Sequence, residues 1–406
     1  MKQFEVPEFY RSPIISKVKA KRKLEDPRKK DFTPTEINLG KITFIIARHF
    51  GFCYGVENAI EKSYKAIQEN PNKRIFLLSQ MIHNPDVNMD LQSYGLQFLQ
   101  DTEGNQLIPF EELNSEDIVI IPAFGTTLEI EEKLRAIGVN IDTYNTTCPF
   151  VEKVWNRSEK LGETEHTIII HGKAKHEETR ATFSHSSSNA PSLIIKDMKE
   201  AKFLGEVILG TKSKIEFNDF FSGKMTPNFD SELHLSKIGV VNQTTMLATE
   251  TQEITDYLRD IMLQKYGEAN LKAHIADTRD TLCYATNDNQ SATYGLLEKE
   301  ADLAVVVGGY NSSNTNHLVE LLDEKFPTFY IKNKEEILSK SAINSFDIHS
   351  SKIVNHTSFI PEKENVRVII SSGASCPDAL VDGVLHKIIS LVDSSIELSS
   401  LLITIE

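Results

Sequence analysis

The chain has 406 residues, of which 40% are hydrophobic and 25% charged, as is typical of a globular protein. At about 150 residues per domain, this length predicts two or three domains. The net charge of −14 argues against nucleic acid or an anionic membrane as the main partner, because both favour a basic surface. Apolar runs such as 118–124 are far shorter than the roughly 18 residues of a membrane helix. We therefore expect a cytoplasmic enzyme without a membrane segment or a signal peptide.

The first forty residues are predicted to be an extension of solvated chain, because 17–31 is highly charged and lacks apolar periodicity. After them, short runs rich in Ile and Val alternate with helical periodicity, as over 56–67 and 150–161. This alternation predicts an α/β fold with mostly parallel, buried strands. The expected strands are 42–47, 75–78, 118–121, 167–170, 192–195, 238–241, 303–307 and 367–370.

Two polar stretches, 211–236 and 342–364, interrupt this rhythm and are interpreted as irregular surface insertions. The pattern as a whole predicts an N-terminal extension, three small α/β domains and a C-terminal tail. The predicted boundaries are 1–40, 41–147, 148–272, 273–385 and 386–406.

Three of the four cysteines share one predicted context, in which a strand leads through a short turn into a helix. Cys53, Cys148 and Cys283 each lie in such a turn, one in each predicted domain. The N–H groups and partial positive charge of a helix N-terminus favour the metal-binding thiolate. Three convergent thiolates suit zinc, or a cubane iron–sulfur cluster with one iron open. The alternative is that each is a small buried hydrophobe. Cys376 lies in a different context, a Gly-Ala-Ser-Cys-Pro turn, and is predicted not to be a ligand.

Other strand ends carry hydroxyl and amide side chains, in the turns 123–127, 242–245, 311–314 and 371–375. Such turns surround a phosphate with N–H and hydroxyl donors, although the same residues also cap helices. His83, His171 and His176 lie close after predicted strands, and Glu177 and Glu178 follow His176. A histidine beside a carboxylate is a proton-delivery arrangement, although a histidine at a strand end is often only a satisfied polar residue.

Eight motifs that occur in order carry a resemblance to a known family: GFCYGVENA, HNPDVN, TTCPFVEKV, HEETRAT, NQTT, LCYATNDNQ, NSSN and GASCPDALV. Over about residues 42–385 the chain resembles the IspH (LytB) family of 4-hydroxy-3-methylbut-2-enyl diphosphate reductases, in its longer branch. The resemblance implies reductive removal of the substrate hydroxyl, which gives isopentenyl and dimethylallyl diphosphate in the last step of the methylerythritol phosphate route. It also implies three α/β domains in a pseudo-threefold arrangement around a [4Fe–4S] cluster.

The resemblance further implies roles for individual residues and an electron donor, which is reduced ferredoxin or flavodoxin. Glu178 matches the carboxylate that delivers a proton, and Thr244 the hydroxyl that relays it and contacts the substrate. Phe124 departs from the pattern, because many members have a histidine there. The cluster ligands are matched by Cys53, Cys148 and Cys283, and the diphosphate-binding set by His83, His176, Ser312, Ser313, Asn314 and Ser375.

Two alternatives remain open at this stage. A non-catalytic iron–sulfur sensor or regulator needs neither a diphosphate pocket nor a proton relay, for both of which the sequence has candidates. A zinc-dependent hydrolase would use the same thiolates but would be colourless.

Overall fold

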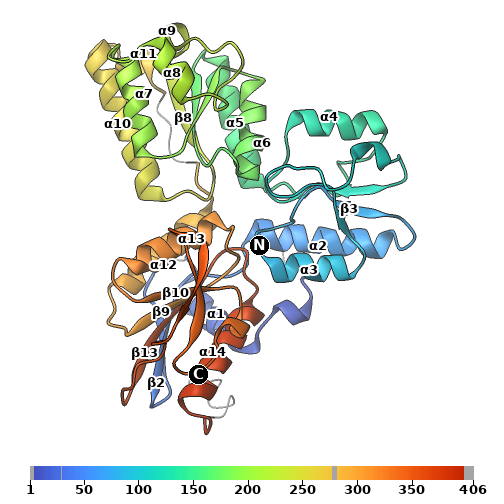
Figure 1. The fold of residues 1–406 in the computed structure, drawn as a ribbon, viewed down its shortest axis with the longest axis vertical. Coiled ribbons are helices and arrows are strands. Elements are labelled where there is room, and N and C mark those ends of the chain that lie inside the picture. The colour runs from blue at the N-terminus through green and yellow to red at the C-terminus, as the bar shows by residue number, and fades with distance from the viewer. Residues whose placement is uncertain (1–3, 29, 277–280, 397–406) are drawn as a thin grey trace. The chain divides into compact units, whose positions relative to one another are not determined.

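A computed structural model describes residues 4–28, 30–276 and 281–396. Their contacts divide the chain into two compact units. The first comprises Met1–Glu57, Ile82–Asp90 and Tyr284–Glu406, and the second Asn58–Met81 and Leu91–Cys283. Both units are α/β, with mostly parallel sheets flanked by helices, as the alternating sequence pattern predicts (Figure 1). No helix among the described residues is both long and apolar enough to cross a membrane.

The first unit is built on a five-stranded sheet in which only the edge strand β1 is antiparallel. Its central strands are runs of consecutive buried and mostly apolar residues, as in ITFII of β2 and LAVVV of β9, which is expected of strands covered on both faces. The strand order is β1 (Thr35–Asn38), β2 (Ile42–Ile46), β13 (Val366–Ser372), β9 (Leu303–Val307) and β10 (Thr328–Ile331). The helices are η1 (Glu8–Tyr10), α1 (Pro13–Glu25), α12 (Tyr284–Leu297), α13 (Ser313–Asp323), η3 (Lys334–Glu336) and α14 (Asp378–Val392).

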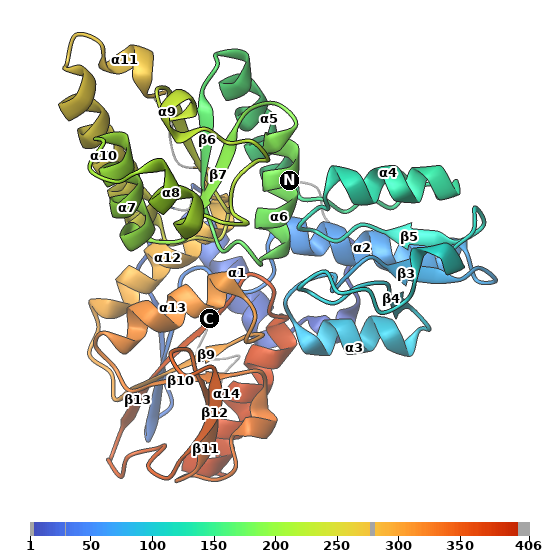
Figure 2. The same ribbon diagram turned by 45° about the horizontal axis from the view of Figure 1, so that its top comes forward.

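The second unit contains two three-stranded parallel sheets. One has the order β4 (Gln97–Phe98), β3 (Ile75–Leu77), β5 (Ile118–Ile120), and the other β7 (Ser192–Ile195), β6 (Thr167–His171), β8 (Ile238–Asn242). Helices α5 (Pro149–Glu163) and α6 (Glu177–Ser187) cover one face of the latter sheet, and α7 (Met198–Ile208) and α10 (Ala248–Tyr266) cover the other (Figure 2). The remaining helices are η2 (Phe110–Glu112), α4 (Leu128–Ile137), α8 (Lys214–Phe220), α9 (Ser231–His234) and α11 (Leu271–His274).

Helices α2 (Tyr54–Glu69) and α3 (Pro85–Ser93) contain residues of both units. All eight strands predicted from the sequence are confirmed, and the helices expected over 56–67 and 150–161 lie within α2 and α5.

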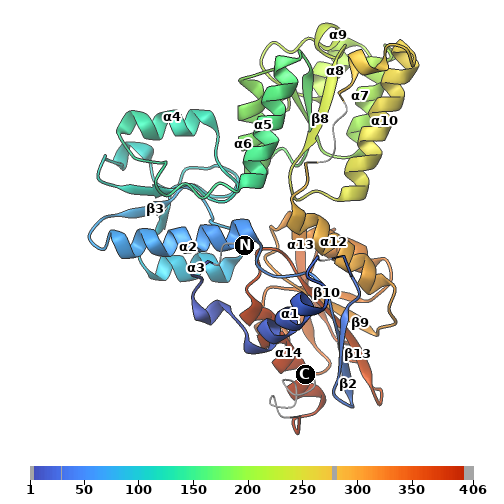
Figure 3. The ribbon, with the colours of Figure 1, turned by 180° about the vertical axis from the view of Figure 1, so that it is seen from behind.

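The prediction that residues 1–40 are a solvated extension is wrong for most of this segment. Ser12 caps α1 by accepting a hydrogen bond from the Ile15 N–H at 3.1 Å, and β1 joins the sheet. Ile15 and Val18 are fully buried in the core of the first unit, where α1 packs beside α14 (Figure 3). The buried face of α1 consists of only Ile14, Ile15, Val18 and Arg22. With three apolar residues among many lysines and arginines, the sequence shows no clear helical periodicity of apolar residues.

The prediction that the two polar stretches are irregular is wrong, because both contain regular secondary structure. Residues 211–236 contain α8 and α9, and the segment buries three phenylalanines, Phe217 in α8 and Phe221 and Phe229 in the chain between the two helices. Residues 342–364 contain an antiparallel hairpin of β11 (Ile343–Asp347) and β12 (Lys352–His356), and β12 is largely exposed.

The predicted domain boundaries also differ from the observed secondary structure at two places. Strand β2, placed in the predicted domain 41–147, pairs with β13 of the predicted domain 273–385. Helix α14 continues to Val392, through the start of the predicted C-terminal tail, and residues 397–406 of that tail lie outside the described residues.

Candidate active site

The three cysteine turns repeat one backbone contact. In each, the cysteine N–H donates to a carbonyl in the polar turn that follows a neighbouring strand, β13, β5 or β8. Each cysteine directly precedes a helix, α2, α5 or α12. The repeat predicted from the sequence is therefore present, with one cysteine turn beside each of the three parallel-stranded sheets. The contacts are Cys53 N to Ala374 O at 3.2 Å, Cys148 N to Ala123 O at 3.0 Å, and Cys283 N to Thr244 O at 3.1 Å.

The same three cysteines are partly exposed, and none forms a disulfide. Cys376 differs, because it is fully buried and burial raises the pKa of its thiol far above the ordinary value. A buried neutral thiol is inert, so its burial disfavours Cys376 as a metal ligand.

Within the second unit, Cys148 lies close enough to Cys283 and Glu178 to be influenced by their charges. Burial, followed by repulsion from Cys283 and Glu178, raises the pKa of Cys148 to about 12, although the N–H groups of Phe150 and Val151 oppose the shift. A thiol with a pKa this high becomes a thiolate only beside a strongly positive group, so Cys148, with the sulfur of Cys283 near it, suits iron or zinc. No three His, Cys, Asp or Glu side chains in the described ranges are grouped to hold a metal, and Cys53 belongs to the first unit.

Glu178 and Thr244 form a buried pair in the second unit. The Thr244 N–H donates to Glu178 Oε1 at 2.5 Å, and the Thr244 hydroxyl donates to Oε2 at 2.9 Å. Burial raises the pKa of Glu178 to about 7, although these two hydrogen bonds favour the charged form. A carboxyl group with this pKa exchanges a proton readily near neutral pH.

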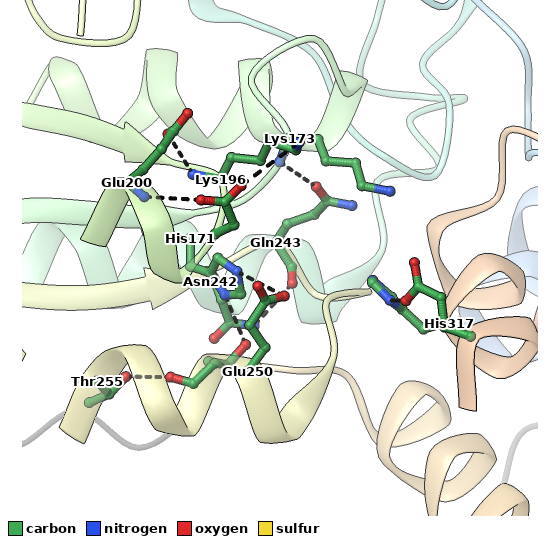
Figure 4. Close-up of polar contacts among 12 residues, drawn as sticks. His171, Lys173, Lys196, Glu200, Asn242, Gln243, Glu250, Thr255 and His317 are labelled. Carbon is green, nitrogen blue, oxygen red and sulfur yellow. Dashed lines mark hydrogen bonds and ion pairs between the residues drawn. The ribbon is translucent and has the colours of Figure 1, made fainter. Parts of the chain in front are cut away.

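His176 is the N-cap of α6 and accepts the Glu178 N–H on Nδ1 at 3.2 Å. Its ring meets Phe124 edge to face, with the ring centroids 5.6 Å apart. Phe124 thus packs against one of the predicted diphosphate ligands. His171 points elsewhere, since its Nδ1 lies 3.0 Å from the Thr251 hydroxyl and its Nε2 lies 3.8 Å from Glu250, both in α10 (Figure 4).

Gln243 is a buried part of this site that the sequence reasoning did not single out. Its Oε1 accepts a hydrogen bond from the Lys173 N–H at 3.2 Å (Figure 4). It accepts a second one from the Thr179 hydroxyl at 2.9 Å. Its Nε2 donates to the Thr245 hydroxyl at 2.7 Å. Gln243 thereby joins the turn before α6 and the first turn of α6, which carries Glu178, to the 242–245 turn, which carries Thr244. Its position in the NQTT turn was the only signal in the sequence.

The first unit brings five predicted residues together at the carboxyl ends of β9 and β13: His83, Ser312, Ser313, Asn314 and Ser375. The Ser375 hydroxyl donates to the His83 carbonyl at 3.0 Å. Asn314 Oδ1 accepts the Ala374 N–H at 3.0 Å, and Ser312 caps α13. The buried Asn314 Nδ2 has no hydrogen-bond partner in the described structure. An unsatisfied buried N–H donor of this kind suits an anionic ligand.

Close backbone approach holds this group together. A Cβ atom at Gly309 would lie 2.3 Å from the His83 carbonyl oxygen, and one at Gly373 would lie 2.0 Å from the Thr315 hydroxyl. Both positions therefore require glycine.

Comparison with known proteins supports the resemblance. The family described as LytB protein matches residues 44–389. A protein of Synechococcus sp. (strain WH7803) named 4-hydroxy-3-methylbut-2-enyl diphosphate reductase is 38% identical over 360 residues, 88% of each chain. A protein of the same name from Prochlorococcus marinus (strain AS9601) is 37% identical over 95% of this chain and 92% of its own.

The fold is also found in a solved structure. The E-1-hydroxy-2-methyl-but-2-enyl-4-diphosphate reductase of Plasmodium falciparum aligns with a TM-score of 0.61 and 20% identity, over 86% of this chain and 88% of that one. On the extent and identity of the sequence matches, this chain belongs to the LytB protein family.

Proposed function

We infer that this protein reduces 4-hydroxy-3-methylbut-2-enyl diphosphate to isopentenyl and dimethylallyl diphosphates. Two electrons and two protons replace the C–O bond to the hydroxyl with a C–H bond and release water. The observation that carries the proposal is the buried Glu178–Thr244 pair close to Cys148, because it supplies a proton donor with a pKa of about 7 beside a candidate cluster ligand.

We propose that Cys53, Cys148 and Cys283 hold one [4Fe–4S] cluster, leaving one iron without a protein ligand. The shared turn contact, the partial exposure of all three cysteines and the electrostatic influence of Cys283 on Cys148 support this assignment. When bound, such a cluster supplies electrons and a Lewis-acidic iron for the substrate oxygen.

Glu178 is assigned as the proton donor of the reaction. In its protonated form it holds a proton on one carboxyl oxygen, and the Thr244 hydroxyl lies 2.9 Å from Oε2. Thr244 both donates and accepts hydrogen bonds, so it relays that proton toward the substrate hydroxyl, which leaves as water.

The diphosphate is assigned to hydrogen-bond donors that the folded chain holds in fixed positions. His83, Ser312, Ser313, Asn314 and Ser375 are each less than one tenth exposed, and Asn314 Nδ2 is a donor with unused capacity. His176 adds a further imidazole, while Phe124 leaves this chain one imidazole short of the usual family pattern. Fixing the diphosphate orients the reacting carbon at the far end of the substrate.

We further propose that reduced ferredoxin or flavodoxin supplies the electrons and that the reaction takes place in the cytoplasm. Four cysteine thiols without a disulfide and a cluster with an open iron both suit a reducing compartment.

Anaerobic purification, followed by iron and sulfide analysis and a turnover assay, tests this function. We expect about four irons and four sulfides per chain, a brown colour, and conversion of the allylic diphosphate with a chemical reductant. A colourless protein that contains zinc would overturn the cofactor assignment. A brown protein without turnover would instead favour the sensor.

A further inference from the structure

Arg22, in the last turn of α1, is an arginine buried in the first unit, with 5% of its surface exposed. Its Nη1 donates to the carbonyl oxygens of Ala47 at 2.6 Å and Arg48 at 2.9 Å, and its Nη2 donates to that of Ile46 at 3.1 Å. Its Nε donates to the Thr35 hydroxyl at 2.6 Å. One guanidinium thus binds three consecutive carbonyls and links α1, β1 and β2.

These three carbonyls occupy the point where β2 ends and the turn to Cys53 begins. Arg48 reciprocates, because its Nη2 donates to the Arg22 carbonyl at 3.2 Å and lies 3.8 Å from Asp26. Arg22, Arg48 and Cys53 also line one pocket of about 310 Å³, formed entirely by residues of the first unit. The guanidinium therefore acts on the segment that carries a proposed cluster ligand.

Asp378 and Lys19 also approach the turn between β2 and Cys53, at Gly51. Gly51 has a φ of +77°, and a Cβ atom there would lie 2.5 Å from Asp378 Oδ1. Asp378, the first residue of α14, binds Lys19 of α1 at 2.7 Å. Helix α1 thus approaches the 48–53 turn with two cationic side chains, one at the carbonyls before the turn and one beside its glycine.

A buried guanidinium is costly, and an apolar side chain would fill the same space without that cost. The fork of donors of an arginine fixes several acceptors in one plane, which a lysine ammonium cannot reproduce. The guanidinium of Arg22 is therefore suited to fixing the backbone of residues 46–48, a task that an apolar residue packing α1 onto the sheet would not perform.

We propose that Arg22 is a positioning residue for the iron–sulfur centre, fixing the end of β2 so that Cys53 presents its thiolate in one orientation. The proposal rests on the function inferred above, because it takes Cys53 as a ligand.

The test compares Arg22→Lys and Arg22→Met with the wild-type holoenzyme. Arg22→Lys keeps the charge and loses the fork, and Arg22→Met loses both. Arg367→Lys is the matched control, since Arg367 also binds a backbone carbonyl, that of Glu300 at 2.8 Å, at the opposite end of the same sheet. Two readouts are used: anaerobic iron release to a chelator, and the alkylation rate of Cys53 relative to Cys148 in the cluster-free protein, resolved by mass spectrometry.

We expect both Arg22 variants to release iron about tenfold faster than wild type, as the loss of charged hydrogen bonds implies, and to show faster alkylation at Cys53 only. Arg367→Lys should stay within about twofold on both readouts. If Arg22→Lys matched the wild type on both, charge alone would suffice and the positioning role would be wrong. If Arg22→Met failed to fold, Arg22→Lys would still decide. A wild type without a cluster would overturn the proposed function instead, while the alkylation readout would still test Arg22.

Discussion

Glu178 acquires its proposed role from its surroundings. Its carboxyl group is buried and accepts two hydrogen bonds from Thr244. Burial therefore outweighs these bonds and raises the pKa to about 7, whereas the exposed Glu216, bonded to Ser213, has a pKa lowered to about 2. The same type of side chain is thus suited to donate a proton at position 178 and caps a helix at position 216.

Replacing Glu178 with Gln should keep the cluster and abolish most turnover, because the amide is similar in shape but cannot deliver a proton. We expect kcat to fall by about 10² or more. Glu177→Gln is the matched control, since Glu177 is the preceding residue and its carboxylate binds the Ser79 hydroxyl instead. Near-normal turnover of Glu178→Gln with full iron content would remove Glu178 from its role.

The raised pKa of Glu178 also determines how the turnover rate should change with pH. The proton donor must be protonated, so activity is full below pH 7 and declines as pH rises through about 7. A profile of kcat against pH with a chemical reductant checks this. A rate that rises through the same range would mean that Glu178 acts as the charged form.

At the scale of single elements, α6 combines helix capping with the proposed chemistry, because its N-cap is His176. Asn is a good N-cap but lacks an imidazole. His176→Asn should therefore retain the stability of the wild type and raise KM several-fold, whereas His176→Ala should also lose about 1 kcal/mol of unfolding free energy. Denaturant unfolding and steady-state kinetics separate the two effects. Equal KM values for His176→Asn and wild type would exclude substrate binding by His176.

Helix α1 should contribute to folding stability despite its charged sequence. Ile15 has no exposed surface, while Leu24 on the same helix is 84% exposed. Ile15→Ala should cost about 2–4 kcal/mol of unfolding free energy, and Leu24→Ala close to none. Chemical denaturation of both variants measures the difference. A cost below about 1 kcal/mol for Ile15→Ala would show that α1 is not part of the core.

The elements that could be predicted are those whose residue pattern reflects how they are buried. Strands such as β9, with five consecutive buried Leu, Ala and Val residues, are recognisable because both faces are covered. The exposed β12 and the two-residue β4 carry no such pattern. The cysteine turns were found because strand, turn and helix follow one another in sequence. Contacts such as that of Cys53 with Ala374 join residues over 300 positions apart, and only the fold brings them together.

For the whole molecule, the proposed centre draws its ligands from turns beside three different sheets. Replacing Cys53, Cys148 or Cys283 with Ala should each abolish the intact cluster, because two thiolates do not hold a cubane. Cys376→Ala should keep it, since that thiol is buried in the core. Iron analysis and low-temperature electron paramagnetic resonance compare the four variants. A full cluster in any of the first three would remove that cysteine from the ligand set.

The segment 211–236 also has a consequence for the protein at high concentration. Its residues pair with the outer strand β7, through hydrogen bonds from the Ile194 N–H to Lys224 O at 2.8 Å and from the Thr226 N–H to Ser192 O at 3.0 Å. Leu193 and Met225 form an antiparallel bridge between them. An open strand edge is a template on which a second molecule can add a strand. Because residues 224–226 already pair with the edge of β7, that apolar strand edge is not open to a strand of a second molecule.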